Sequence, residues 1–199
     1  MADFEEVSVK LQSGSDVKIR AWQGHEDAQP LVIVAPNSSV ADWEDFVSFL
    51  PASQAPILAE VSSSLELLML IWEIGDPALV MAQGQSAVDI ACGLVTTAPA
   101  AASGIIVCDG EISPEQADGM HEISTLVLRG RQGKTLSHPA AVKMHELVGN
   151  STLIEPENCS DFPAKDNPDA AASAINMFLA GASGSFDEES EADPIDPKA

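Results

Sequence analysis

Apolar runs and alternating segments follow one another along the chain in an order typical of an α/β protein. Residues 5–9 and 17–21 alternate apolar and polar side chains around a short turn, which predicts an antiparallel hairpin. Later runs rich in Val, Ile and Leu are typical of strands buried on both faces of a parallel sheet. These predicted strands cover residues 31–34, 56–61, 78–82, 104–108, 125–129 and 152–154.

Segments of helical length, with apolar residues three and four positions apart, lie between those strands. They predict helices over residues 41–50, 65–74, 86–97, 114–120, 139–148 and 168–179. A hairpin followed by alternating strands and helices specifies a doubly wound, mostly parallel sheet that is covered on both faces. We expect Trp22, Trp43 and Trp72 to pack in or near its core. Functional residues of such folds lie beyond the carboxyl ends of the strands.

Length and charge define the organisation and exclude some partners. The 199 residues fit one domain, which we assign to residues 1–181, with a disordered acidic tail over residues 182–199. The net charge of -22 repels phosphates, so neither nucleic acid nor a membrane is an expected partner. The acidic surface gives solubility or attracts a basic partner. With no signal peptide at the start, the expected location is the cytoplasm.

The residues that commonly bind metals or cofactors are scattered. Cys92, Cys108 and Cys159 form no Cys-x-x-Cys pair, and two of them lie in apolar runs typical of core positions. No two histidines share metal-ligand spacing, so we expect no metal site. The turn over residues 82–87 lacks the Gly-x-Gly-x-x-Gly pattern of a dinucleotide site, and we expect no cofactor.

The strand over residues 78–82, a tight turn and the helix that follows have the plan of a nucleophile elbow. The usual Gly-x-Ser-x-Gly motif is absent, and two registers remain. If Ser86 is at the apex, the β-branched side chain of Val88 lies two residues later and crowds the tight turn, where the motif has glycine. The length of the following helix nevertheless suits this register. If Gly84 is at the apex, small residues flank it and glycine adopts the strained backbone freely, but no nucleophile remains. We favour Gly84.

Five stretches in order resemble the α/β-hydrolase superfamily, and the resemblance runs from about Phe4 to Leu179. They cover residues 31–46, 64–87, 98–110, 124–147 and 153–179. The resemblance implies an α/β-hydrolase-like, doubly wound sheet with an N-terminal antiparallel hairpin. Only fourteen residues separate Asp109 from Ser124, where many relatives insert a lid, so we expect no cap domain and a shallow cleft.

The family's functional positions, carried over by this resemblance, hold altered residues. Its His-Gly oxyanion segment becomes Ala35-Pro36, and the next residue, Asn37, is the oxyanion-type position. The position of its acid falls on Gln132 or Gly133, and the position of its histidine falls on Asp161. An aspartate with a pKa near its usual value of about 3.9 is too weak to act as the general base of a serine relay.

Two functions follow from these substitutions. The first is a non-catalytic α/β-hydrolase-fold protein with a binding or interaction role, whose partner is a small acyl ligand or a protein. The alternative is a divergent serine esterase or thioesterase that acts on a small acyl substrate through Ser86, with Asp109 and His138 as a salvage triad. Each of the three residues also has a structural explanation: a helix cap, a turn and a helix start.

Overall fold

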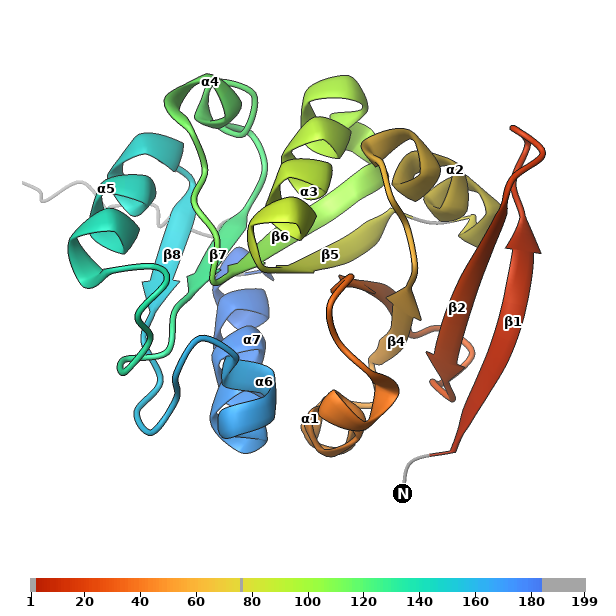
Figure 1. Cartoon of the computed structure of the whole chain (residues 1–199), viewed down its shortest axis with the longest axis horizontal. Helices are drawn as coiled ribbons and strands as arrows, with labels where there is room; N and C mark the ends of the chain where they lie inside the picture. Colours follow the sequence, from red (N-terminus) through yellow and green to blue (C-terminus); the bar gives the residue numbers. More distant parts are fainter. Residues whose placement is uncertain (1–2, 76, 184–199) are drawn as a thin grey trace, which may run out of the picture.

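The computed structural model describes residues 3–75 and 77–183, and their strands form a single sheet (Figure 1). The strands are β1 (Phe4–Lys10), β2 (Asp16–Trp22), β3 (Gln29–Val34), β4 (Gln54–Ala59), β5 (Ala78–Gln83), β6 (Ala102–Cys108), β7 (Thr125–Leu128) and β8 (Ser151–Ile154). Their order is β1-β2-β4-β3-β5-β6-β7-β8. β2 pairs antiparallel with β1 and β4, and all later pairs are parallel. The predicted mostly parallel sheet with an N-terminal hairpin is therefore confirmed.

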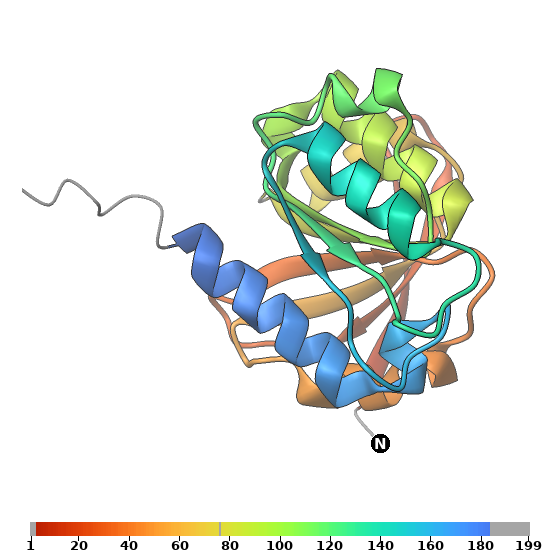
Figure 2. The same cartoon turned by 90° about the vertical axis from the view of Figure 1, so that its left-hand side faces the viewer.

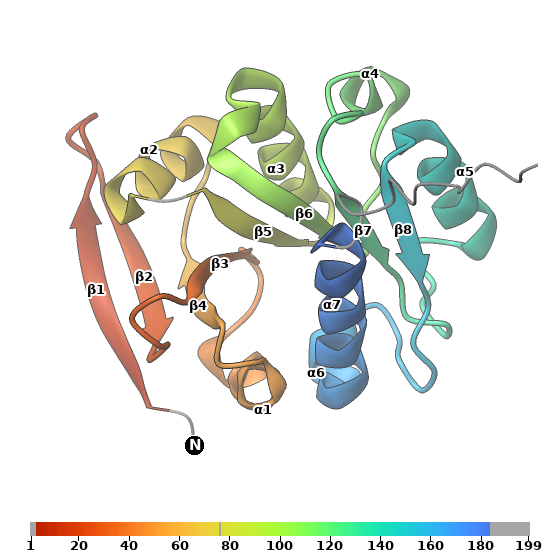
Figure 3. The same cartoon turned by 180° about the vertical axis from the view of Figure 1, so that it is seen from behind.

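Helices cover both faces of this sheet. The α-helices are α1 (Glu44–Phe49), α2 (Ser64–Ile74), α3 (Gln85–Thr97), α4 (Pro114–Ala117), α5 (His138–Val148), α6 (Pro163–Asp166) and α7 (Pro168–Ser183). Two 3-10 helices, η1 (Val40–Asp42) and η2 (Pro99–Ala101), join them. Figure 2 shows α3, α4 and α5 above the sheet and α1, α6 and α7 below it, and Figure 3 shows the second group from behind. α2 packs beside α3 on the first face.

The core consists of two apolar clusters separated by the sheet. Side chains alternate between the faces of a strand, so Val32 and Val34 pack toward α2 and α3, whereas Leu31 and Ile33 pack toward α1 and α7. All four side chains are fully buried. Strands of this kind need no polar alternation, because both of their faces are covered.

Local sequence signals set the helix ends. The Ser63 side chain accepts a hydrogen bond from the Glu66 N–H at the start of α2, and Gly75, with a φ of 97°, ends it. The single helix predicted over residues 41–50 is wrong, because the structure divides it into η1 and α1. Asp42 caps the start of η1, because its carboxylate accepts bonds from the Ser39 N–H and hydroxyl.

Trp72 is the clearest error among the predicted core residues. Trp22 and Trp43 are 4% and 0% exposed, but Trp72 is 56% exposed. The inner face of α2 is already filled by other apolar side chains, so Trp72 is left on the outer face. The buried residues are Leu67, Leu68, Leu70 and Ile71. All three cysteines are free and buried, Cys159 included.

The remaining expectations concern the lid and the tail. Within the described chain, the segment between Asp109 and Ser124 adds only α4 as a helix, and no cap domain is present. α7 continues to Ser183, past the predicted start of the tail, and residues 184–199 lie outside the described residues. Among the described helices, none is both long and apolar enough to cross a membrane.

Gly130 marks a close approach between two loops at the carboxyl edge of the sheet. A Cβ at this position would lie 2.7 Å from the Cys159 carbonyl carbon and closer still to the Ser160 carbonyl oxygen. Such contacts are shorter than atoms tolerate, and the groups involved are backbone that cannot rotate away. Only glycine fits here without displacing the loop.

We therefore expect Gly130→Ala to lower the free energy of unfolding by about 1–3 kcal/mol, as overpacking does. Urea unfolding followed by circular dichroism measures this. Gly181→Ala is the matched control, since an added Cβ would meet no atom within 4 Å and alanine favours the helix. Equal stability of the two variants would contradict the close approach.

Candidate functional site

The turn between β5 and α3 lies at the carboxyl edge of the sheet, and Gly84 is its apex. Gly84 has φ 83° and ψ 163°, a conformation that is essentially restricted to glycine. Its N–H donates to the Cys108 carbonyl at 2.8 Å, and its own carbonyl accepts from Ala87 and Val88 at 3.1 Å. The turn has the sharp geometry of an elbow, but its apex carries no side chain.

Ser86 lies within the first turn of α3 and not at the apex. Its side chain is exposed and makes no hydrogen bond to any described residue. Val88 is fully buried and packs against Gly110, where a Cβ would lie 2.6 Å from a Val88 methyl carbon. The valine therefore does not crowd the turn, because glycine on the neighbouring strand end makes room for it.

The turn after β3, where the sequence resemblance places the oxyanion-type position, is held by a short chain of hydrogen bonds. Trp43 Nε1 donates to Ser38 Oγ at 2.8 Å, and that hydroxyl donates to the Ala35 carbonyl at 2.9 Å. Asn37, in the same turn, is exposed, and its side chain makes no hydrogen bond to the described residues. The turn is thus ordered by its neighbours, while Asn37 itself points to no partner.

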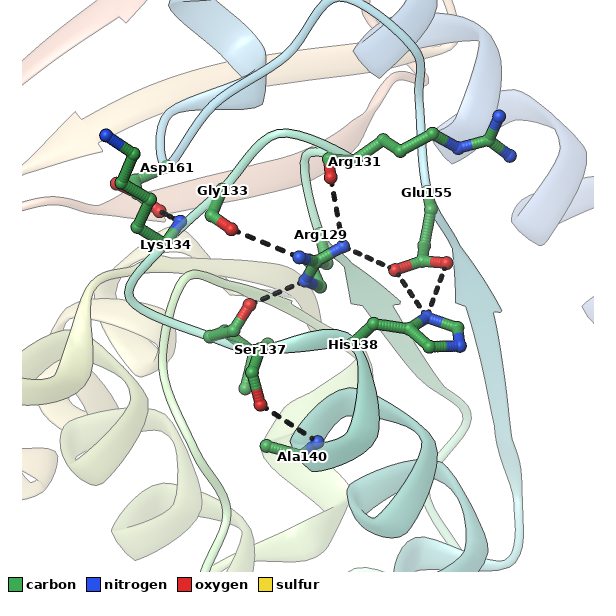
Figure 4. Close-up of polar contacts among 10 residues, drawn as sticks. Arg129, Arg131, Gly133, Lys134, Ser137, His138, Ala140, Glu155 and Asp161 are labelled. Carbon is green, nitrogen blue, oxygen red and sulfur yellow. Dashed lines mark hydrogen bonds and ion pairs between the residues drawn. The ribbon is translucent and has the colours of Figure 1, made fainter.

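Asp161, which the sequence resemblance places at the family's histidine position, connects its loop to the loop that contains Lys134 and to the end of β5 (Figure 4). Its Oδ1 accepts from the N–H groups of Lys134 at 2.5 Å and Thr135 at 2.9 Å, and its carbonyl accepts from Gln83 Nε2 at 2.9 Å. The hydrogen bond from the Thr135 N–H lowers the pKa of Asp161, and the bond from the Lys134 N–H adds to this effect. Together they outweigh the effect of partial burial, so the pKa lies below its usual value. Asp161 is therefore an ionised loop anchor and a weak base.

Asp109 lies next to this anchor, just after β6. It is not a glycine, yet its φ is 54°, a left-handed conformation that aspartate tolerates better than most residues. Burial and the nearby Asp161 carboxylate raise the pKa of Asp109 from 3.8 to about 6. Hydrogen bonds from Leu136 and Thr135 act to lower this pKa but do not outweigh the increase. The structure thus brings Asp109 together with Asp161, a pairing that the sequence did not indicate.

His138, at the start of α5, turns toward Glu155 (Figure 4). Its Nδ1 lies 2.8 Å from Glu155 Oε2 and 3.0 Å from Oε1. Burial acts to raise the pKa of Glu155, but hydrogen bonds from His138 and Arg129 outweigh it and keep that pKa below its usual value. Within the described residues, no hydrogen bond joins any two of Ser86, Asp109 and His138.

Arg129 is the central residue of this group, and sequence reasoning missed it. Its guanidinium contacts Glu155 Oε1 at 2.6 Å and donates to the Leu136 and Gly133 carbonyls at 2.5 and 3.1 Å. The residue is only 7% exposed. The signal was present: a single charged residue ends an otherwise apolar strand, and Glu155 follows the neighbouring parallel strand at the same edge.

A hollow of about 610 Å³ opens beside the elbow turn, between α3, α4 and α5. Its lining is mixed and includes the apolar Ile112, Met144 and Leu147 and the charged Glu111 and Lys143. Gln85 and Asp89 also line it, and Gln85 Nε2 donates to Asp89 Oδ1 at 3.0 Å. In the part of the chain that the structure describes, no group of three or more His, Cys, Asp or Glu residues is placed to hold a metal ion.

Comparison with solved structures identifies proteins of the same shape, although no protein-family model and no curated protein matches the sequence. A predicted CIB-like hydrolase from Thermoplasma acidophilum has a TM-score of 0.73 and 10% identity, over 89% of this chain and 99% of that one. The haloalkane dehalogenase DbeA from Bradyrhizobium elkani has a TM-score of 0.71 and 13% identity, over 92% and 100%. The carboxylesterase CesB from Bacillus subtilis has a TM-score of 0.70 and 12% identity, over 90% and 92%. At such low identity the likeness concerns the fold alone.

The conformation of Gly84 gives a direct test of the apex. We expect Gly84→Ala to lower the free energy of unfolding by about 1–3 kcal/mol through backbone strain alone, because the space around its Cβ is open. Ser86→Ala, two residues later in a helix, should stay within about 0.5 kcal/mol of the wild type. Denaturant unfolding of both variants measures the difference. A large loss of stability in Ser86→Ala, with none in Gly84→Ala, would show that Ser86 and not Gly84 occupies the apex.

The raised pKa of Asp109 predicts how stability depends on pH. The folded state keeps this proton up to about pH 6, whereas the unfolded chain loses it near 3.8, so stability falls as pH rises between these values. Asp109→Asn tolerates the same backbone and removes the cost of burying a charge. We expect the variant to be more stable than the wild type by about 1 kcal/mol near neutral pH, after discounting for partial exposure.

Thermal or urea unfolding between pH 4 and pH 8 checks this expectation, and the difference between the two proteins should vanish at the acidic end. Asp118→Asn, at an exposed aspartate, is the control and should show no such trend. A gain from Asp109→Asn that is constant across the range would show that the carboxyl group is not the cause.

Proposed function

Because the chain has the α/β-hydrolase fold, we propose that it is a non-catalytic protein of this fold with a binding role. The observation that carries the proposal is the glycine at the elbow apex. A nucleophilic mechanism needs a hydroxyl, thiol or carboxylate at the turn, within reach of a base. Gly84 offers none of these groups.

The neighbouring residues support the same conclusion. The carboxylate of Asp161, at the histidine position, already accepts two backbone N–H groups, and its lowered pKa makes it a poor proton acceptor. A general base must be free to take a proton from the attacking group. Asp161 instead uses its acceptor capacity to hold the loop that contains Lys134 and Thr135.

The binding part of the proposal rests on the hollow beside the elbow turn. Its volume of about 610 Å³ is within the usual range for small-molecule sites, which are apolar with a few polar groups. Ile112 and Met144 supply apolar lining for a ligand chain, and Gln85 and Asp89 are among its polar lining residues. A small acyl ligand would place its chain against these apolar residues.

The second candidate is a divergent serine esterase or thioesterase that acts on a small acyl substrate through Ser86. One observation favours it: Glu155 holds His138 through Nδ1, as the acid of a catalytic triad holds its histidine. However, His138 makes no hydrogen bond to Ser86 within the described chain, and Ser86 lies in a helix. The first candidate therefore fits the geometry better.

Short p-nitrophenyl esters and a fluorophosphonate probe test the proposal together. We expect the wild type and Ser86→Ala to hydrolyse p-nitrophenyl acetate and butyrate at the same background rate, because no activated nucleophile is present. Neither protein should be labelled stoichiometrically by the fluorophosphonate. Mass spectrometry of the intact chain measures the labelling.

His138→Ala and an active carboxylesterase complete the experiment as controls. The esterase shows that substrate and probe react under the chosen conditions. Hydrolysis and labelling that are lost in both Ser86→Ala and His138→Ala would establish the esterase alternative and reject the non-catalytic proposal. Weak hydrolysis that all variants share is the reaction of surface groups and leaves the non-catalytic proposal standing.

A further inference from the structure

The outer face of α2 presents an apolar stripe to solvent. Leu65 and Trp72 are 55% and 56% exposed, and Met69 lies partly buried between them. Residues four and seven positions apart share one face of a helix, so the three side chains form a continuous row, which we call the α2 stripe. Apolar rows of this kind on a folded domain mark interaction surfaces more often than single exposed leucines do.

A second apolar feature lies against the same row. A hollow of about 370 Å³ opens beside Trp72, with Pro77, Ala98 and Ala100 among its lining residues. Of the described residues that line it, each is apolar or glycine, and none carries a charge. An exposed tryptophan beside an apolar hollow is the arrangement in which one large apolar side chain of a partner contributes most to binding.

This surface lies at the opposite end of the sheet from the elbow turn. Pro77 precedes β5, and Ala98 and Ala100 follow α3, so the hollow lies at the amino ends of the strands. Gly84 directly follows Gln83, the last residue of β5, and so lies at the opposite, carboxyl end of that strand. The α2 stripe is therefore a second surface, which goes beyond the proposed role of the elbow region.

Charge decides which kind of partner fits. Glu73, next to Trp72 on α2, is exposed and has no ion pair within the described chain. The whole chain carries a net charge of -22. A second copy and an anionic lipid surface are both repelled by that charge, whereas a basic protein is attracted.

We propose that the α2 stripe docks a basic amphipathic helix of a partner protein. The partner helix lays its apolar face along Leu65, Met69 and Trp72 and places one large apolar side chain in the hollow. Lysine or arginine residues on its flank face Glu73. Apolar contact supplies the affinity, and the opposite charges supply the orientation and the rate of association.

The chain's own tryptophans provide the readout. Trp22 and Trp43 are buried, so Trp72 dominates solvent-sensitive fluorescence. The full chain is titrated with a tryptophan-free Leu/Lys peptide that has helical periodicity, and with a scrambled peptide of the same composition. We expect only the periodic peptide to shift the emission to shorter wavelength and to protect Trp72 from acrylamide. Trp72→Phe should remove both signals.

Matched variants separate docking from general attraction to an acidic protein. Leu65→Ser should weaken binding of the periodic peptide about tenfold, as loss of a well-packed apolar contact does. Phe49→Ser removes an equally exposed apolar side chain from α1 on the other face and should change nothing. Circular dichroism confirms that each variant is folded.

Three outcomes would overturn the proposal. The first is an equal response to the scrambled peptide, and the second is an unchanged affinity in Leu65→Ser. The third is self-association of the wild type, seen by sedimentation, that Leu65→Ser abolishes, because a second copy would then cover the stripe. None of these results bears on catalysis, since the ester assay reports on Ser86 at the other end of the sheet.

Discussion

Burial of both faces of the central strands is the constraint on which the rest of this structure depends. The runs 31–34, 79–82 and 105–108 are almost completely excluded from solvent. A charged side chain inside them would lose its hydration without gaining a partner, at a cost of several kcal/mol. Polar groups are therefore confined to the strand ends, where Asp109 and Arg129 lie. The carboxyl edge collects titratable side chains by this necessity, whether or not it catalyses a reaction.

At that edge the polar groups bind one another. A buried guanidinium must be neutralised and fully hydrogen-bonded, and the loop after β7 folds so that its carbonyls and Glu155 meet this need of Arg129. Asp161 satisfies two further N–H groups of the same loop. A catalytic centre depends on the opposite condition, in which preorganised groups stay available for the transition state. At this edge the hydrogen bonds of Arg129 and Asp161 stabilise loops.

The features that the sequence predicted are those that local pattern determines. Strand and helix order follow from the apolar periodicity, and the turn glycine from the conformation it must adopt. The sequence could not show which face of α2 was already filled, so Trp72 was misplaced in the core. The contacts among Arg129, Glu155 and His138 also depend on loops that meet only after the sheet has formed, and no local periodicity records them.

The two ends of the sheet therefore differ in what they offer a partner. Binding free energy comes from groups that gain more from the partner than they lose by leaving water, and groups already paired inside the protein gain little. At the carboxyl edge Asp161 Oδ1 and the Arg129 guanidinium already have internal partners. At the amino edge Trp72 and the hollow beside it remain in water, where covering them is favourable for any apolar side chain that fits. The amino edge can thus bind an apolar partner without any change to the carboxyl edge or to the fold between them.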